Sequence, residues 1–295
     1  MRQALSYFAN KTKGVLQMSI IVQSGTRADM HTHSDNSHDS VCSIEDMCLA
    51  QIERGTTIMA VTDHFSALEY TVNDSFDSFC EVHKKIEFMN KKYDGRCRIL
   101  SGIEIGEGYA NISVYEKIMS LIDFDVVIGS VHKLRENDMF KSFSKTDFSK
   151  FTEEKLYTAI DTYLDDVILM VETLDIDILA HIAYPLRYIV WMHDRKVDIT
   201  RFTQKFEKIF RIIIEKNIAL EINTSHFGVM GALNPPAKLL VLYRNLGGKL
   251  ITLGSDAHNA EAASCYFGEV IEILKTLGFE NIYYYKNRKP YPIEI

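Results

Sequence analysis

Histidine and aspartate side chains are concentrated in one short segment near the start of the sequence. Residues 29–39 contain three histidines and three aspartates within eleven positions. His31 and His33 are two positions apart, so in an extended strand both imidazoles leave the same face. Two neighbouring imidazoles suit a borderline-soft metal such as zinc, manganese or iron. A solvated turn would show the same pattern, so this pair by itself is a weak signal.

The same residue types recur downstream, each time at the end of a short apolar run. Such runs are typical of buried strands. Besides a first strand that carries His31 and His33, we expect six more near 57–62, 98–106, 125–132, 177–181, 217–224 and 249–256. All but one of the predicted strands end in His, Asp or Glu, and the exception ends in Asn223-Thr224. The residues at the strand ends are His31, His33, His64, Glu104, His132, His181, Asp256 and His258.

Amphipathic segments alternate with these strands. The periodicity predicts helices over about 44–53, 75–93, 113–122, 152–174, 200–216, 234–245 and 261–277, with loops at 133–150 and 184–197. About seven such alternations indicate parallel strands with right-handed crossovers. An open sheet collects ligands at one switch point, whereas a barrel brings every C-terminal strand end to one mouth. Polar residues on six of seven strands therefore favour an α/β barrel with its active site at that mouth.

The composition limits the other classes of function. The chain has 295 residues, 46% of them apolar, and 33 basic against 40 acidic residues, a net charge of −7. An acidic chain without a basic run is a poor partner for long nucleic acids. No apolar run approaches the ~20 residues of a membrane helix. The five cysteines are scattered and lack a C-x-x-C pair, which is typical of reduced thiols in a cytoplasmic protein.

Residues 1–27 lie outside this repeating pattern. We expect them to form an N-terminal extension, and residues 28–295 to form a single domain. A signal peptide is the alternative, but the apolar part of this segment is interrupted by Gln17 and Ser19, and no clear cleavage site follows it.

Together with Asp39, the strand-end residues would place six imidazoles and three carboxylates at one mouth. Three confined carboxylates would raise one another's pKa, whereas divalent ions remove that repulsion and keep imidazoles neutral. Because one zinc ion takes about four ligands, two or three ions sharing a carboxylate fit the set best. Such a cluster lowers the pKa of a bridging water and binds the oxygens around phosphorus. The pattern therefore predicts a hydrolase, with phosphoesters favoured.

Four motifs in this order resemble those of the polymerase and histidinol phosphatase (PHP) family of metal-dependent phosphoesterases, over about residues 28–275. They are Asp29-Met-His31-Thr-His33 with Ser37 and Asp39, Thr62-Asp63-His64, Gly102-Ile-Glu104 with Gly129-Ser-Val-His132, and Gly254-Ser-Asp256-Ala-His258. Within the family the chain is most similar to the histidinol phosphatases. That similarity lies in Asp177-Ile-Leu-Ala-His181 with Arg187-Tyr188, and in Glu221-Ile-Asn-Thr-Ser225.

The resemblance implies a distorted (β/α)7 TIM-like barrel with a trinuclear metal site of zinc, manganese or iron. A first ion would take His31, His33, Glu104 and Asp256; a second would share Glu104 and add His132 and His181; a third would take Asp39, His64 and His258. Glu104 and Asp256 would be the catalytic residues, acting through a metal-bound hydroxide. Many relatives carry His in place of Asp39, which leaves the third ion's identity open, and neighbouring His38 is a weaker candidate.

Other residues receive lesser roles. Arg187, six residues past His181, is the candidate for a bidentate phosphate contact, and Lys133 is a second candidate. Asp29 and Asp63 are expected to orient imidazoles rather than to bind metal. Glu221 alternates with Asn223, points into a barrel interior, and is expected to be structural.

Three functions remain open at this point. The favoured one is a metal-dependent phosphomonoesterase that converts L-histidinol phosphate to L-histidinol and phosphate, a step of histidine biosynthesis. The alternative is a phosphodiesterase or nuclease with the same metal-site architecture, acting on nucleotides or short oligonucleotides. A non-catalytic, metal-stabilised barrel is the third, and the complete ligand set argues against it. The partner would be a small phosphorylated substrate, with no membrane, and the sequence does not choose between a monomer and a homodimer.

Overall fold

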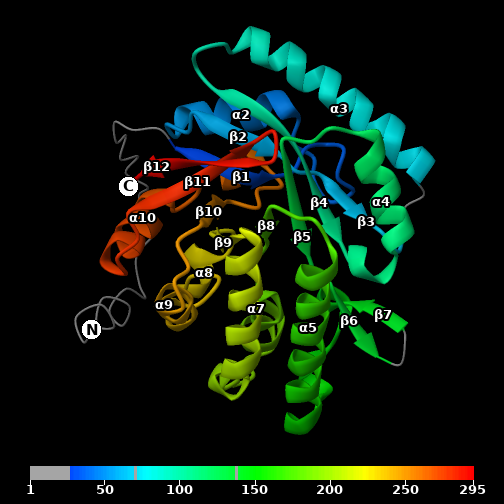
Figure 1. Cartoon of the computed structure of the whole chain (residues 1–295), viewed down its shortest axis with the longest axis vertical. Helices are drawn as coiled ribbons and strands as arrows, with labels where there is room; N and C mark the ends of the chain where they lie inside the picture. The colour runs from blue at the N-terminus through cyan, green and yellow to red at the C-terminus, as the bar shows by residue number, and fades with distance from the viewer. Residues whose placement is uncertain (1–26, 70–71, 137–138) are drawn as a thin grey trace.

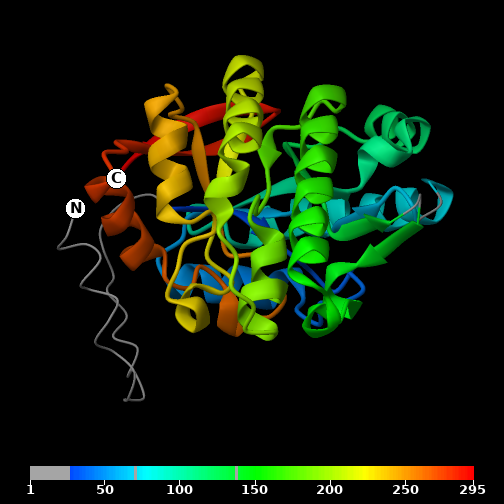
Figure 2. The same ribbon diagram turned by 90° about the horizontal axis from the view of Figure 1, so that it is seen from below.

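The computed structural model describes the backbone of residues 27–69, 72–136 and 139–295. Residues 1–26, almost all of the expected N-terminal extension, lie outside the described part of the chain. The described residues form a parallel sheet wrapped by helices (Figures 1 and 2).

The parallel sheet is curled into a nearly closed barrel (Figure 1). Seven strands follow one another in the order β1-β2-β4-β5-β8-β9-β10, and β3 continues beyond β2 along the same neighbour, β4. Backbone hydrogen bonds join the two ends, because the Asp256 amide donates to the His31 carbonyl at 2.8 Å and the His33 amide to the Ala257 carbonyl at 2.9 Å. The strands are β1 (Ala28–Thr32), β2 (Ile58–Val61), β3 (His64–Ser66), β4 (Arg98–Gly106), β5 (Val126–Ser130), β8 (Ile178–Leu179), β9 (Ala219–Asn223) and β10 (Ile251–Gly254).

This arrangement confirms the predicted (β/α)7 barrel. The apolar sequences of the strands explain why the sheet is buried on both faces. Apart from Arg98 at the start of β4 and the short β3, every strand residue of the barrel is buried, as a sheet covered on both faces requires.

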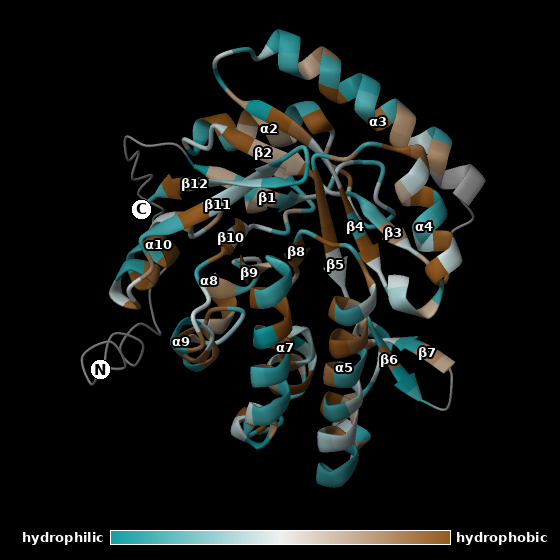
Figure 3. Ribbon diagram, in the orientation of Figure 1, coloured by the Kyte–Doolittle hydropathy of each residue, from teal (hydrophilic) through white to brown (hydrophobic). Residues whose placement is uncertain are grey.

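Helices cover the outside of the barrel (Figure 2). Each has an apolar face, and teal and brown residues alternate around α5 and α7 in Figure 3. In α7, Phe206, Ile209, Phe210 and Ile213 are buried at helical spacing. The main helices are α2 (Ile44–Glu53), α3 (Val72–Lys92), α4 (Ile112–Leu121), α5 (Glu153–Thr173), α7 (Thr203–Lys216), α9 (Ala237–Asn245) and α10 (Phe267–Thr276). None of the described helices is long and apolar enough to span a membrane, and all five cysteines are free.

Two segments expected to be loops contain regular structure. Between residues 133 and 150, β6 (Lys133–Glu136) pairs antiparallel with β7 (Met139–Ser142), and two 3-10 turns that bury Phe143 and Phe148 follow. Residues 184–192 form the short helix α6 (Tyr184–Leu186) and a π-helical turn (Arg187–Met192). The expectation of plain loops was wrong because a few large side chains, spaced irregularly, anchor these segments.

A C-terminal hairpin, β11 (Asn281–Lys286) with β12 (Lys289–Glu294), closes the amino-terminal end of the barrel. Its turn residue Arg288 donates from Nε to the Asp177 carboxylate, and the Arg288 backbone amide donates to the Asp125 carbonyl at 2.9 Å. Asp125 and Asp177 directly precede β5 and β8, so the turn lies against the strand starts. Burial raises the pKa of Asp177 to about 6, although Arg288 opposes that shift.

We predict that Arg288→Ala lowers the free energy of unfolding by about 2 kcal/mol at pH 8, because it leaves the ionised Asp177 buried without its partner. The loss should be smaller at pH 5, below the folded pKa of Asp177, where the carboxyl group can take up a proton. Urea unfolding at both pH values measures this, with the exposed neighbour Lys289→Ala as control. Equal losses of unfolding free energy in Arg288→Ala and Lys289→Ala would contradict the role of Arg288 as the partner of buried Asp177.

Candidate metal centre

The Glu104 carboxylate lies at the centre of a group of histidines at the C-terminal ends of the strands. Its Oε1 is 3.2 Å from His132 Nε2 and 3.1 Å from His181 Nε2. Its Oε2 is 2.8 Å from His64 Nδ1 and 3.3 Å from His31 Nε2. The sheet register explains part of this, because His64 on β3 pairs directly with Glu104 on β4. The two carboxylate oxygens therefore face different sets of imidazoles, as a bridging carboxylate must.

Asp256 approaches the same group from the end of β10. Its Oδ1 is 3.3 Å from His33 Nε2 and 3.7 Å from His31 Nε2. The barrel closure sets this geometry, because the Asp256 amide is hydrogen bonded to the His31 carbonyl. The backbone of Asp256 adopts a left-handed φ of 53°, a conformation that is costly for a non-glycine residue and is often kept at functional sites.

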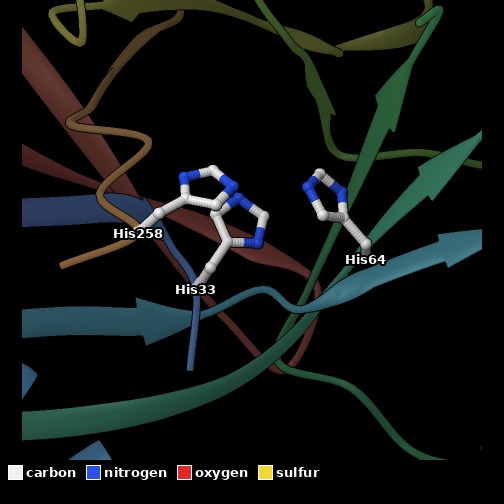
Figure 4. A group of neighbouring side chains, drawn as sticks. All are labelled: His33, His64 and His258. Carbon is white, nitrogen blue, oxygen red and sulfur yellow. The ribbon is translucent and has the colours of Figure 1, made fainter. Parts of the chain in front are cut away.

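Asp39 lies at the outer edge of the cluster. Its Oδ2 is 3.5 Å from His64 Nε2 and 3.4 Å from His258 Nε2. The imidazoles of His33, His64 and His258 point toward one another in Figure 4, with the His33 ring stacked on both neighbours at centroid distances of 4.2 and 4.1 Å. The His38 side chain is 66% exposed, so Asp39 is better placed than its neighbour. The structure thus brings all nine predicted ligands together.

The donor set fits divalent metal ions. Four groups of three side chains have candidate ligand atoms that all lie within 4.8 Å of one another: His33, His64 and His258; His31, His33 and Asp256; His31, Glu104 and His181; and His64, Glu104 and His132. The buried atoms His31 Nε2, His33 Nε2 and Glu104 Oε2 lie close to one another but make no well-aligned hydrogen bond in the described structure. Leaving such atoms without a partner costs about 1–3 kcal/mol each, and a cation among them supplies the missing partner.

The cluster also favours ionised carboxylates. Burial alone would raise the pKa of Glu104, but the neighbouring imidazoles of His31, His64 and His132 hold it well below its usual range. The pKa of Asp256 is likewise held low, against the effect of burial, by His31, His33 and His258. Burial and the nearby His64 lower the pKa of His33 well below its usual range. Anionic carboxylates are ready to bind metal, but against the effect of burial they raise the pKa of His31, and that of His64 to about 10. Metal binding would therefore displace protons from these two imidazoles.

Asp29 and Asp63 support the centre less directly than expected. Asp63 accepts hydrogen bonds from the Ser34 amide at 2.6 Å and from Ser37 Oγ at 2.8 Å, and Ser37 Oγ lies 3.2 Å from His33 Nδ1. Asp29 accepts from the Ser255 amide at 2.9 Å, which joins β1 to the end of β10. In the described structure neither carboxylate hydrogen bonds to an imidazole, so both act through the backbone or through serine.

Glu221 is a residue whose contacts the sequence did not reveal. Its Oε1 is 2.6 Å from His31 Nδ1, and its Oε2 accepts from the His181 amide at 2.7 Å. The only signal was the alternation with Asn223, which indicated that the side chain points inward. The partners lie 190 and 40 positions away in the chain, so no local pattern could have found them.

Arg187 lies beside the cluster, at the start of the π-helical turn. It lines a narrow cavity together with His181, Tyr184, His226, Phe227 and Asp256. The described residues offer the guanidinium no ion-pair partner, and its Cζ lies 5.4 Å from the centre of the Tyr188 ring. Lys133, the second phosphate candidate, is engaged elsewhere, because its Nζ lies 2.8 Å from Glu69 Oε1 and 3.3 Å from Ser66 Oγ.

A family model described as the PHP domain matches residues 29–225, more than half of the chain. The chain belongs to the PHP family. Two similar proteins are each called a probable histidinol-phosphatase. The one from Clostridium acetobutylicum is 25% identical over 89% of this chain and 98% of its own length, and the one from Thermotoga maritima is 28% identical over 85% and 93%.

A crystal structure of histidinol phosphate phosphatase from Lactococcus lactis, in complex with zinc, L-histidinol and phosphate, has a similar fold. The TM-score is 0.72 at 24% sequence identity, and the match covers 90% of this chain and 98% of the other. At this identity the likeness establishes the shared PHP barrel.

Asp256 and His258 lie beyond the range that the PHP model matches. The structure nevertheless places them against His33, because the segment that follows β10 is hydrogen bonded to β1 and to His33 and so completes the barrel. The candidate metal centre therefore combines residues from the first and the last strand of the barrel.

Proposed function

We propose that this protein is a metal-dependent phosphomonoesterase that hydrolyses L-histidinol phosphate to L-histidinol and phosphate. The observation that carries the proposal is Glu104, a fully buried carboxylate whose two oxygens face separate groups of histidines at the barrel mouth. The names of the similar proteins and the ligands of the Lactococcus lactis structure support histidinol phosphate as the substrate.

The ligand roles extend this proposal. His31, His33, Glu104 and Asp256 would hold a first ion; Glu104, His132 and His181 a second; Asp39, His64 and His258 a third. Zinc, manganese or iron bound there would activate water and neutralise charge on the phosphate oxygens. Glu104 and Asp256 keep the centre anionic.

Arg187 supplies the positive charge that the substrate phosphate requires outside the metal cluster. Its guanidinium can donate two parallel hydrogen bonds to phosphate oxygens. Tyr184, whose ring centre is 4.9 Å from that of His181 and 5.0 Å from that of His132, forms the adjoining wall. The cavity thus places a cationic and an aromatic side chain beside the proposed second ion.

We predict that Arg187→Lys raises the KM for histidinol phosphate about tenfold, because a point charge replaces a bidentate contact worth about 1.5 kcal/mol or more. Arg187→Ala should raise the KM further, and both variants should keep the bound metal. Steady-state kinetics and metal analysis measure the two effects. Arg195→Lys is a matched control, since its guanidinium donates to the carbonyls of Phe148 and Phe151 away from the centre. An unchanged KM in Arg187→Ala would remove Arg187 from the substrate site.

The test of the proposed function is phosphate release from L-histidinol phosphate by protein loaded with zinc or manganese. We expect saturable release that is lost in Glu104→Gln. Nucleotides and short oligonucleotides should be assayed in parallel. Release from them alone would replace the proposal with the phosphodiesterase alternative.

A further inference from the structure

β9 neither contains a predicted metal ligand nor is followed directly by one, yet its Glu221 side chain reaches the metal centre. The side chain is buried, with 1% of its surface exposed. Both of its carboxylate oxygens are engaged, one with His31 and the other with His181. These two histidines belong to different ions in the proposed arrangement. Glu221 therefore contacts ligands of both ions, as Glu104 does, but at His31 Nδ1 and the His181 amide rather than at the Nε2 atoms.

The contact with His31 favours one tautomer of that imidazole when an ion is bound. His31 Nε2 faces Glu104 and Asp256, where the first ion would lie. The proton must then reside on Nδ1, which donates to Glu221 Oε1 at 2.6 Å. A carboxylate in this position fixes the tautomer and the orientation of the ring, and makes the imidazole a stronger ligand.

The contact with His181 holds the backbone amide of that residue rather than its imidazole ring. The His181 amide donates to Glu221 Oε2 at 2.7 Å, and the same oxygen accepts from Asn223 Nδ2 at 3.2 Å. His181 has a positive φ of 20°, which persists only where the surroundings hold it. The side chain of His181 then points its Nε2 at Glu104 Oε1, 3.1 Å away.

We propose that Glu221 is a positioning residue that couples the first two metal sites, so that both ions bind tightly only while its carboxylate spans His31 and His181. This inference rests on the metal-dependent function proposed above. Gly254 makes the arrangement possible, because a Cβ at that position would collide with the Glu221 carboxylate and with the His31 side chain. The glycine of the Gly254-Ser-Asp256 motif therefore makes room for a residue on the neighbouring strand.

A glutamine at this position cannot replace the glutamate. Both partners are donors, the His31 Nδ1 proton and the His181 amide, and a carboxylate offers an acceptor to each. Glutamine offers one acceptor and one donor group, so one contact becomes a donor facing a donor. We expect Glu221→Gln to weaken binding of the first two ions together by about 10- to 100-fold, the loss typical of a residue that supports metal ligands.

The experiment is a competition titration of wild-type and Glu221→Gln protein with zinc in the presence of a chromophoric chelator, with cobalt(II) absorption as a second readout. Asp177→Asn is the matched control. It makes the same change of a buried carboxylate at the opposite end of the barrel, where Asp177 accepts from the Val127 amide at 2.8 Å. The expected result is weaker binding and an altered cobalt spectrum in Glu221→Gln, and unchanged binding in Asp177→Asn.

Two results would overturn the proposal. One is a folded Glu221→Gln protein that binds zinc as tightly as the wild type, and the other is a loss confined to one of the two ions. If Glu221→Gln does not fold, the same zinc titration is made with Glu221→Asp. This variant keeps the charge, but its side chain is one methylene too short to reach both partners. Unchanged zinc affinity in that variant would equally reject the coupling.

The readout does not depend on the substrate. Wild-type protein that binds metal but leaves histidinol phosphate intact would contradict the proposed function, and the zinc affinities of the variants would still decide the role of Glu221. In an active enzyme, excess metal should restore part of the activity of Glu221→Gln, because the variant retains every ligand. Activity that stays lost at saturating metal would overturn a role limited to positioning.

Discussion

Glu104→Gln is expected to abolish phosphatase activity and to remove bound metal. The carboxylate is the shared contact of His31, His64, His132 and His181, and all four distances lie between 2.8 and 3.3 Å. An amide offers one weaker oxygen and places a donor where the proposed second ion would require an anion. We expect activity to fall about a thousandfold or more, beyond the 10- to 100-fold typical of a residue that only supports a ligand.

Metal analysis of the dialysed protein, together with phosphate release at saturating substrate, measures this effect. The comparison requires a control that also loses a buried carboxylate, and Asp177→Asn at the opposite barrel end provides one. Both variants should keep the helical and strand signal of the wild type. If Glu104→Gln retained its metal and its turnover, Glu104 could not be the bridging residue.

The second large effect is expected on removing the metal. Dialysis against a chelator should abolish turnover, and zinc or manganese should restore it. The apoprotein should remain folded, because the barrel has an extensive core of buried aliphatic and aromatic side chains. It should be less stable, however, since a ligand present at 100 times its Kd contributes about 2.7 kcal/mol to the free energy of unfolding.

Thermal unfolding with and without metal tests the stability, and titration of the apoprotein gives the number of ions. Three ions per chain would agree with the ligand set that includes Asp39, and two would limit the centre to the ligands around Glu104. Turnover that survives complete removal of metal would rule out the proposed mechanism. Calcium is a useful control cation, because it takes six to eight oxygen ligands, whereas this centre is rich in imidazole nitrogens.

Much of this centre could be predicted because the pattern that reveals it is local. Buried parallel strands appear as short apolar runs, and their carboxyl ends must meet at one mouth once the sheet closes. His31, Glu104 and Asp256 could therefore be grouped without knowledge of any contact, and the structure brings them together. The barrel itself followed from the same reasoning, since only closure brings ligands from so many strands to one point.

The tertiary structure alone decided how these residues are held. Glu221 and His31 are 190 positions apart, and their contact exists because β9, β10 and β1 lie side by side in the closed sheet. Arg187 reaches the cavity because irregularly spaced large side chains turn residues 184–192 into helix, a pattern with no simple period. The local sequence at the strand ends predicts which residues are candidate ligands. The orientation of each side chain depends on long-range packing, which only the folded chain determines.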